Sequence, residues 1–487
     1  MYVNQRGLVI PKKLVSPEEI ESMKRDLTLI PKKNHVMPVE EKPIAAFREN
    51  EQKLYIPRFY GIDRYAVESC PHEIEDRIPE GDPIQVPFVR ELRDYQKHIV
   101  GVYFDHVKDG SGGAILEVPC GRGKTIMALN ICSVLQKKTL ILVHKEFLMN
   151  QWIERISDFV PSARVGKIQG PKFDIENKDI VIGMIQTIYN RSYSPKAFDS
   201  FGLTIIDEVH RIGSEEFSKT LFKISTAYML GISATVERKD GLTNILYMFI
   251  GPKIYEEERK ESSTVEVRAM FYEHPDESYS TEEFDFRGKI KYSTMVSKIS
   301  GFPPRQRFIV TLLEDLIKEN PSKQIMVLSH KRDLLDYLDE NVTKKGFASC
   351  GQYVGGMKQS ALQLTEEKQI VLATYAMAAE ALDIKSLNTL VMVSPKTDIT
   401  QSVGRILRTE CAGKIIVDIV DSHDVFQNQW KRRKTFYRKS SYCIKKIHKP
   451  EYTNMIDHSK FVTLYDPTVI KPKKGKKDAE EVSVYPF

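Results

Sequence analysis

Short apolar runs alternate with helical patterns along two long stretches of the chain. The runs cover 139–144, 179–184, 203–208 and 228–235 in the first stretch, and 324–330, 369–375, 389–394 and 414–420 in the second. Runs that are apolar at every position are typical of parallel strands buried on both faces of a sheet. Residues 307–320 show instead the apolar spacing of a helix. The pattern therefore predicts an α/β protein with two parallel sheets, each covered by helices on both faces.

The breaks in this pattern suggest where the parts of the chain begin and end. A turn-rich acidic stretch precedes residue 85, and a charged run (EEERKES) follows residue 255. Between 256 and 304 we expect one strand, at 265–272, and a polar insertion that ends at Pro303 and Pro304. The expected parts are an N-terminal accessory region (1–84), two α/β units (85–255 and 256–450) and a basic tail (451–487).

The bulk composition excludes several classes of protein. With 28% charged and 41% hydrophobic residues over 487 positions, the chain is expected to be soluble and globular. The six cysteines form no C-x-x-C pair, which favours a reducing compartment over a disulfide framework or a zinc site. No signal peptide or membrane-spanning run is evident, so we expect an intracellular protein without a membrane partner. The formal charge of +6 permits a polyanionic partner without requiring one.

A glycine-rich loop follows the first predicted strand of the 85–255 unit. Residues 114–125 read AILEVPCGRGKT, and a helical pattern continues after them. Glycines let backbone N–H groups surround a phosphate, and the helix N-terminus adds a favourable dipole. Lys124 can reach the β- and γ-phosphates of ATP, and the Thr125 hydroxyl can ligate Mg²⁺. The residues expected to hold these cofactors are Pro119, Cys120, Gly121, Arg122, Gly123, Lys124 and Thr125.

Two adjacent carboxylates end the predicted strand at 203–208. Asp207 is placed to hold Mg²⁺, and Glu208 is the candidate general base that orients and deprotonates the attacking water. An Asp-Glu pair at a strand end is as often structural as catalytic. Its place in the same unit as Lys124 favours the catalytic interpretation. His210 has no neighbouring cluster that would make it a zinc ligand.

Five segments occur in a fixed order: LRDYQ (92–96), GRGKT (121–125), DEVH (207–210), SAT (233–235) and QSVGRILR (401–408). Over about residues 88–450 this order resembles the superfamily 2 DExH-type helicases, in which the phosphate loop is shortened, as it is after Val118 here. The segments are most similar to the XPB-like group, the phage branch-migration helicases, and the transcript-release helicases of poxviruses and other large DNA viruses. The resemblance implies two tandem RecA-like domains at 85–255 and 256–450.

The resemblance also implies residue roles. Arg93 and Gln96 would recognise the nucleotide base, the alternative being that Tyr95 and Gln96 only cap a helix. Residues that would couple hydrolysis to domain movement are His210, Ser233 and Thr235. In the segment at 372–384, Asp383 would contact the ribose or only cap a turn, because Ala381 stands where relatives have glycine.

The QSVGRILR segment predicts a helix with three polar side chains on one face. Gln401, Arg405 and Arg408 are spaced at i, i+4 and i+7. This face can present guanidinium groups to a γ-phosphate held by the other domain, and an arginine finger of this kind accelerates hydrolysis by ~10³–10⁵. We expect Arg408 to be the finger and Arg405 its neighbour, with Gln401 beside them. The alternative is a solvated basic face.

Nucleic acid is the expected partner, held by its backbone at loops that follow strands. The candidates are His144, Lys145, Gln151, Gln186, Thr187, His330, Lys331 and Thr374. Each is equally interpretable as an ordinary polar surface residue. Trp152 is more typical of a core than of a base-stacking wedge.

Three other segments combine basic residues with aromatic or lysine-rich sequence. Residues 425–449 hold nine Lys and Arg and no acidic residue, with Tyr437 and Tyr442 among them, which suits either phosphate contact with stacking or a solvated helix face. The lysines of 471–477 predict a nonspecific tail. Residues 54–62 (LYIPRFYGI) are interpreted either as an accessory nucleic-acid-binding element or as a hairpin packed on the first domain, with packing preferred.

Three functions are therefore compared. The first is an ATP-dependent helicase that unwinds or remodels duplexes, and the second is a translocase that moves on a duplex without separating its strands. The third, a scaffold without ATPase activity, is disfavoured because the candidate site residues are intact. The viral resemblance suggests a role in transcript release with RNA polymerase or transcription factors as partners, in a virion or the host cytoplasm, and we expect a monomer.

Overall fold

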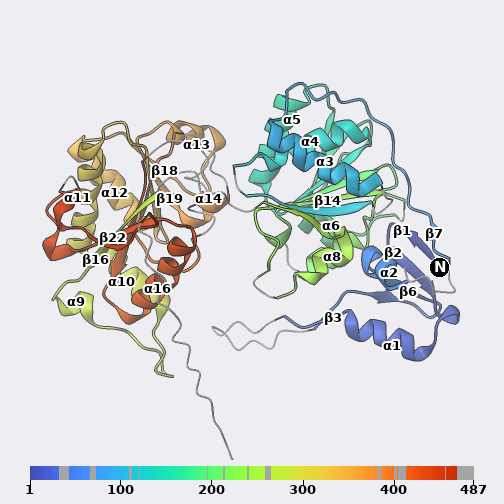
Figure 1. Ribbon diagram of the computed structural model, residues 1–487, viewed down its shortest axis with the longest axis horizontal. Helices are drawn as coiled ribbons and strands as arrows, with labels where there is room; N and C mark the ends of the chain where they lie inside the picture. The colour runs from blue at the N-terminus through green and yellow to red at the C-terminus, as the bar shows by residue number, and fades with distance from the viewer. Residues whose placement is uncertain are drawn as a thin grey trace, which may run out of the picture. The chain divides into compact units, whose positions relative to one another are not determined.

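The computed structural model describes residues 1–31, 43–65, 73–108, 112–119, 121–194, 196–211, 214–238, 241–257, 265–380, 384, 386–399, 403, 413–455 and 457–468 (Figure 1). The chain divides into two compact units, residues 1–259 and 260–487. The described part contains no helix long and apolar enough to cross a membrane.

An eight-stranded sheet forms the centre of the first unit, in the order β11-β10-β12-β9-β13-β14-β8-β15. Its strands are β8 (Gly113–Glu117), β9 (Thr139–Val143), β10 (Val165–Gln169), β11 (Lys172–Phe173), β12 (Ile180–Met184), β13 (Leu203–Asp207), β14 (Tyr228–Ser233) and β15 (Lys253–Glu256). Every pairing is parallel except that of β11 with β10. The parallel sheet predicted from the apolar runs is confirmed, and β10, β11 and β15 are additions to it.

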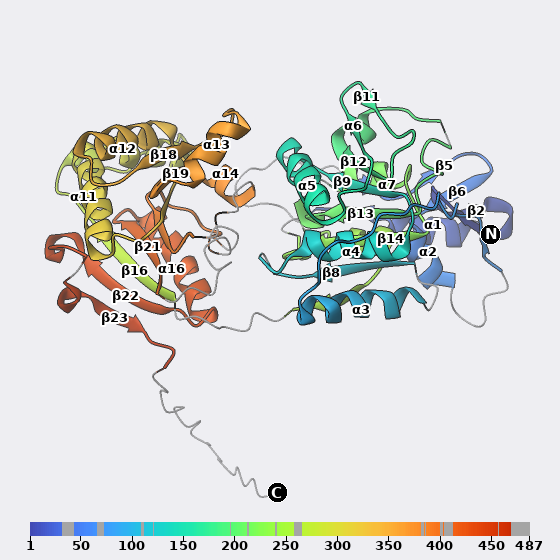
Figure 2. The same ribbon diagram turned by 90° about the horizontal axis from the view of Figure 1, so that it is seen from above.

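Helices cover both faces of this sheet because successive strand side chains point to opposite sides. In β9, Leu140 and Leu142 join one core while Ile141 and Val143 join the other. The helices α3 (Asp94–Lys108), α4 (Lys124–Leu135) and α5 (Glu146–Phe159) lie over one face, and α6 (Ile185–Asn190), α7 (Ser214–Leu221) and α8 (Asn244–Ile250) lie over the other (Figures 1 and 2). Because the strands are parallel, their carboxyl ends meet at one edge of the sheet, which the helices leave open.

The N-terminal region packs on the face covered by α6–α8. Its sheet has the order β5-β6-β2-β1-β7, formed by β1 (Tyr2–Asn4), β2 (Gly7–Pro11), β5 (Arg48–Glu49), β6 (Lys53–Ile56) and β7 (Glu75–Asp76), beside the pair β3 (Thr28–Leu29) and β4 (Ile44–Ala45). The helix α1 (Pro17–Asp26) begins after Ser16, whose hydroxyl accepts the Glu19 N–H. Leu8, Ile56 and Phe59 join the same core as α8.

Residues 54–62 pack on the first unit, as preferred, and do not form a free nucleic-acid-binding element. They are not a hairpin, however: β6 pairs with β2, and α2 (Arg58–Tyr65) follows it. Pro57 separates the two elements, and the buried side chains of Arg58 and Phe59 direct α2 onto α8 and the ends of β8 and β14.

The second unit contains another eight-stranded sheet, in the order β18-β19-β17-β20-β21-β16-β22-β23. Its strands are β16 (Val265–Tyr272), β17 (Ile325–Ser329), β18 (Cys350–Tyr353), β19 (Ile370–Thr374), β20 (Thr389–Met392), β21 (Lys414–Asp421), β22 (Cys443–His448) and β23 (Val462–Tyr465). Only β23 pairs antiparallel. The four strands expected from the apolar runs and the strand expected at 265–272 are all present.

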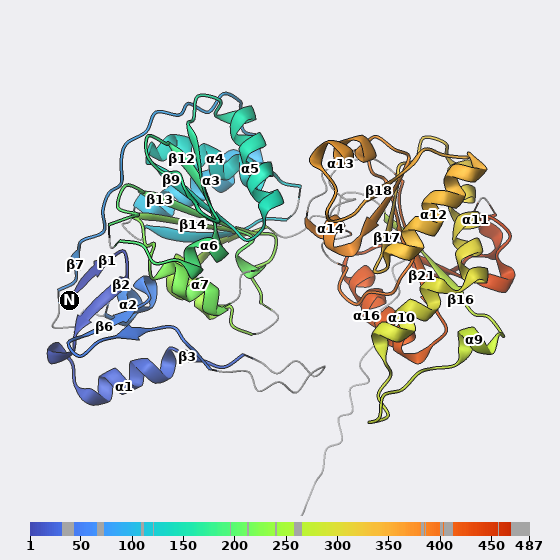
Figure 3. The ribbon, with the colours of Figure 1, turned by 180° about the vertical axis from the view of Figure 1, so that it is seen from behind.

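The helices of the second unit are α9 (Glu277–Ser280), α10 (Tyr292–Gly301), α11 (Pro303–Glu319), α12 (Arg332–Lys345), α13 (Gln359–Glu366), α14 (Tyr375–Glu380) and α16 (Asp424–Lys439) (Figure 3). Pro303 and Pro304 do not interrupt the fold. They occupy the first turn of α11, where a missing N–H costs nothing.

Strand β21 is tied to a helix on each face by a buried ion pair. Asp421 binds Arg305 of α11 at 2.6 Å, and Asp418 binds Arg433 of α16 at 2.8 Å. Because Arg433 and Tyr437 are buried on this pair, they are unavailable to nucleic acid, and the two interpretations of 425–449 stay open only for its exposed basic residues.

Candidate active site

The loop after β8 forms a backbone cradle in front of α4. The Val118 N–H donates to the Ser233 carbonyl at 2.8 Å, which fixes the loop to β14. Gly121 and Gly123 have φ values of 84° and 80°, a left-handed conformation that disfavours side chains. A Cβ on Gly123 would collide with the Gln96 amide. Lys124 and Thr125 follow as the first residues of α4, with the N–H groups of that turn at the open edge.

Gln96 holds this loop from α3. Its Nε2 donates to the Arg122 carbonyl at 3.0 Å, and its Oε1 accepts the Arg93 N–H at 3.0 Å. The Tyr95 hydroxyl donates to the same carbonyl at 3.3 Å. Gln96 therefore fixes the start of α3 and holds the phosphate loop, and its contact with a nucleotide base stays a prediction.

Arg122 is held on the outer side of the loop. Its guanidinium lies 3.7 Å from the centroid of the Tyr95 ring, and its Nε donates to Glu257 at 3.0 Å. The pKa of Arg122 is raised, mainly by this hydrogen bond to Glu257. Tyr95 and Glu257 were not among the expected site residues, and only the proximity of Tyr95 to Gln96 in sequence pointed to either.

The acidic pair lies at the carboxyl end of β13 beside the loop. The Lys124 ammonium is 3.6 Å from Glu208, and His210 Nδ1 is 3.5 Å from the other carboxylate oxygen of Glu208. Glu208 has a φ of 50°, rare for a residue with a side chain. The chain thus turns sharply after the strand, and Glu208 faces both Lys124 and His210.

His210 links the acidic pair to β14, because it lies 3.5 Å from Glu208 and hydrogen-bonds Ser233. His210 Nδ1 lies 2.7 Å from Ser233 Oγ. The Ser233 hydroxyl donates its one proton to the Thr235 carbonyl at 2.5 Å, so His210 Nδ1 is the donor in the first pair. The structure therefore brings together the three residues expected to couple hydrolysis to movement.

Asp207 is buried behind Glu208, with 7% of its surface exposed. Burial, followed by the charge of Glu208, raises the pKa of Asp207 to about 6. Trp152 of α5, which is 1% exposed, donates its indole N–H to Asp207 Oδ2 at 2.9 Å. The expectation that Trp152 belongs to the core is confirmed, but its role as the partner of Asp207 was not foreseen.

The nucleic-acid candidates gather at the carboxyl edge of each sheet. In the first unit, His144 and Lys145 follow β9, and Gln186 and Thr187 follow the adjacent β12. Thr187 Oγ1 already accepts the Gly170 N–H at 3.1 Å. Gln151 lies on α5.

In the second unit, His330 and Lys331 follow β17, and Thr374 ends the adjacent β19. The His330 ring lies 4.6 Å from the Tyr375 ring, and its Nε2 is 3.0 Å from the Pro395 carbonyl. Burial, followed by the charge of Lys396, lowers the pKa of His330, so this side chain is neutral near pH 7. Because the Pro395 carbonyl can only accept, the single N–H of the neutral ring is on Nε2, and Nδ1 is left as an acceptor that adds no charge.

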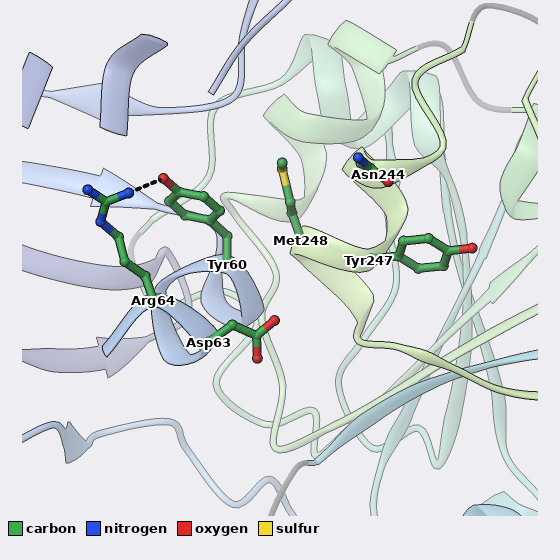
Figure 4. Close-up of a pocket in the computed structure, with 6 residues that line it drawn as sticks. All are labelled: Tyr60, Asp63, Arg64, Asn244, Tyr247 and Met248. Atoms are coloured by element: carbon green, nitrogen blue, oxygen red, sulfur yellow. Dashed lines mark hydrogen bonds between the residues drawn. The ribbon is translucent and has the colours of Figure 1, made fainter. Parts of the chain in front are cut away.

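Five expected site positions lie outside the described residues: Cys120, Asp383, Gln401, Arg405 and Arg408. A separate pocket between α2 and α8 is lined by Tyr60, Asp63, Arg64, Asn244, Tyr247 and Met248 (Figure 4). Arg64 donates to the Tyr60 hydroxyl there at 3.0 Å, and both bind Asp26. None of the lining residues belongs to the candidate site, so these contacts are interpreted as structural.

Two protein families match the chain. The res subunit of type III restriction enzymes matches residues 90–238, and the helicase conserved C-terminal domain matches residues 309–413. Among solved structures, the Hef helicase domain of Pyrococcus furiosus covers 70% of this chain and 98% of its own, with 15% identity and a TM-score of 0.47.

Similar proteins occur in large DNA viruses. A protein of Acanthamoeba polyphaga mimivirus, provisionally named an ATP-dependent RNA helicase, is 34% identical over 464 residues, covering 92% of this chain and 86% of the relative. A protein of African swine fever virus with the same provisional name is 27% identical and covers 72% and 73%. A provisionally named helicase of Invertebrate iridescent virus 6 is 26% identical and covers 74% and 84%.

The two parallel α/β sheets and the two family matches define a superfamily 2 helicase with tandem RecA-like domains. Within that class, the chain belongs to the family of ATP-dependent helicases of large DNA viruses that includes the mimivirus protein. It is therefore an ATP-dependent enzyme of a family that uses Mg²⁺ and acts on nucleic acid.

Proposed function

We propose that residues 119–125 hold ATP and Mg²⁺, and that the chain couples hydrolysis to movement along an RNA strand. The observation that carries the proposal is the continuous path from Lys124 through Glu208 and His210 to Ser233. This path links the phosphate-binding loop to the end of β14, where helicases of this family couple ATP hydrolysis to movement. RNA is preferred because the mimivirus and African swine fever virus relatives are provisionally named RNA helicases.

The residues fit this nucleotide. The left-handed Gly121 and Gly123 keep the loop open for phosphate oxygens, and the ammonium of Lys124 offsets their charge. Thr125 and Asp207 supply oxygen ligands of the kind that Mg²⁺ prefers. When bound, ATP supplies the phosphoanhydride bond whose hydrolysis provides the free energy for movement. Glu208 Oε then accepts a proton from the attacking water.

Further roles are proposed from the sequence motifs. Arg93 and Gln96 contact the base, Asp383 contacts the ribose, and Arg405, Arg408 and Gln401 stabilise charge on the γ-phosphate. Lys145, Gln186, Thr187, His330 and Thr374 contact the strand. The likeness to transcript-release helicases supports RNA polymerase or a transcription factor as a partner, in a virion or the host cytoplasm.

The test is ATP hydrolysis measured with single- and double-stranded RNA, DNA and hybrids. We expect a several-fold stimulation by RNA, and a loss of about 10²-fold or more in Lys124→Ala because a preorganised charge on the phosphates is removed. Lys97→Ala, which changes an exposed lysine of α3, is the matched control. Hydrolysis that no polymer stimulates would contradict the proposal. Strand displacement measured in parallel separates a helicase from a duplex translocase.

A further inference from the structure

The segment between α9 and α10 carries an unusually exposed aromatic side chain. Phe286 is 91% exposed, the largest fraction among the exposed large hydrophobic residues of the described chain, and Phe284 beside it is 51% exposed. The segment extends beyond the helices of the second unit in Figures 1 and 3. Burial in the core therefore does not explain an aromatic residue at this position.

The turn that presents Phe286 is well defined. A bridge pairs Phe284 with Ile290, and the Lys291 N–H donates to the Glu283 carbonyl at 2.8 Å. Asp285 Oδ1 accepts the N–H groups of Arg287 and Lys289, both at 2.9 Å. These bonds fix the backbone on both sides of Phe286, so little conformational entropy is lost when its ring meets a ligand.

The turn carries three basic and two acidic side chains. Arg287, Lys289 and Lys291 are exposed, and no salt bridge to any of the three occurs within the described part of the chain. The Arg287 guanidinium lies 5.0 Å from the centroid of the Phe286 ring. The Asp285 carboxylate is directed at the backbone N–H groups of its own turn. An exposed ring with a guanidinium beside it and two further cations on the same turn suits a base that stacks and phosphates that pair.

The base of the turn adjoins the candidate strand-contacting residues of the second unit. The segment leaves the sheet at the carboxyl end of β16, the edge where β17 and β19 also end. Tyr292, next to Lys291, donates its hydroxyl to the Pro395 carbonyl at 3.0 Å. His330 Nε2 lies 3.0 Å from the same carbonyl. The turn and His330 are thus connected through one loop.

We propose that the turn of residues 283–291 is a second contact for single-stranded nucleic acid, in which Phe286 stacks on a base while Lys289 and Lys291 pair with phosphates. The inference rests on the proposed function, because it extends the strand path that begins at His330 and Thr374. A protein ligand is disfavoured because it would require a contiguous apolar surface, whereas here Phe284 and Phe286 share their turn with the exposed Arg287, Lys289 and Lys291.

The test measures the affinity of the full chain for a fluorescein-labelled single-stranded RNA of mixed sequence, without ATP. We expect Phe286→Ala and Phe286→Leu to weaken binding alike, by roughly 5- to 150-fold, because neither side chain can stack. Phe286→Trp should retain the affinity, and its emission should be quenched by RNA, against a constant background from the buried Trp152 and Trp430. Leu364→Ala, which shortens a 64% exposed side chain of α13, is the control.

Salt dependence separates stacking from charge. Phe286→Ala should leave the slope of log Kd against log salt unchanged, whereas Lys289→Ala and Lys291→Ala should each lower it by about 0.7. An affinity of Phe286→Ala equal to that of the unaltered chain, or an affinity retained by Phe286→Leu, overturns the stacking proposal. If RNA stimulates hydrolysis in that same preparation, the proposed function survives this failure. Absent stimulation in the unaltered chain would instead refute the proposed function.

Discussion

Asp207 lies in surroundings that disfavour the ionised form of its carboxyl group. Burial and the neighbouring charge of Glu208 disfavour the ionised carboxylate, and the N–H of Trp152 offsets only part of this. Trp152 lies 27 residues after the GRGKT segment and 55 residues before Asp207. The sequence could place Trp152 in the core, but its hydrogen bond depends on how α5 packs over β13.

The raised pKa predicts that Asp207 destabilises the folded chain above pH 6. Between pH 3.8 and about 6, the folded state retains a proton that the unfolded state has released, so the free energy of unfolding falls as pH rises. Asp207→Asn keeps an oxygen for Trp152 and removes the charge. We expect it to be more stable by about 1–3 kcal/mol at pH 8, but not below pH 4, and to lose Mg²⁺-dependent hydrolysis. Thermal unfolding of both proteins across this pH range checks the prediction, and a variant that is less stable at pH 8 contradicts it.

Among the elements, α2 determines how the N-terminal region joins the first unit. Arg58 at its start is 5% exposed and donates Nη1 to the carbonyls of Thr226, at 2.9 Å, and Ala227, at 3.2 Å, just before β14. The same guanidinium lies over the Phe59 ring. One side chain therefore connects α2 to the strand that carries Ser233.

Replacing this arginine is expected to loosen the first unit. Arg58→Ala leaves two buried carbonyls without their donor and opens a cavity beside Phe59, so we expect a loss of about 2–4 kcal/mol in the free energy of unfolding. Arg64→Ala on the same helix removes a more exposed ion pair with Asp26 and should cost less than about 1 kcal/mol. Equal losses in denaturant unfolding would argue against this role of Arg58.

The elements that could be predicted are those whose pattern is local. Strands such as β9 and β13 are apolar throughout because both faces are covered. Strands β10 and β22 lie next to the outermost strands and include Lys167 and Lys445, so no continuous apolar run marks them. The sequence could not show which side chains of the basic stretch at 425–449 are buried, because Arg433 meets its partner Asp418 only in the folded chain.

For the whole molecule, the alternation of runs and helical patterns was sufficient to predict two α/β units. The order of the motifs likewise located the Lys124 loop and the acidic pair, which the structure brings together. The N-terminal sheet could not be predicted, because its short strands pair across long stretches of sequence. Arg405 and Arg408 fall outside the described residues, and their role is still a proposal.

That role predicts a division between nucleotide binding and turnover. If Arg408 acts as an arginine finger, Arg408→Ala should lower kcat by about 10³-fold or more while the Kd for ATP changes little. Arg432→Ala, an exposed arginine of α16, should leave both unchanged. Steady-state hydrolysis and calorimetric titration of Mg·ATP measure the two quantities. A large loss of affinity with an unchanged kcat would assign Arg408 to binding instead.

The left-handed backbone at Glu208 sets stability against the carboxylate that it presents. Glycine adopts this conformation without the penalty of roughly 1–2 kcal/mol that a side chain incurs. Glu208→Gly would therefore unfold at a higher temperature, but it would leave the Lys124 ammonium without the carboxylate that lies 3.6 Å away.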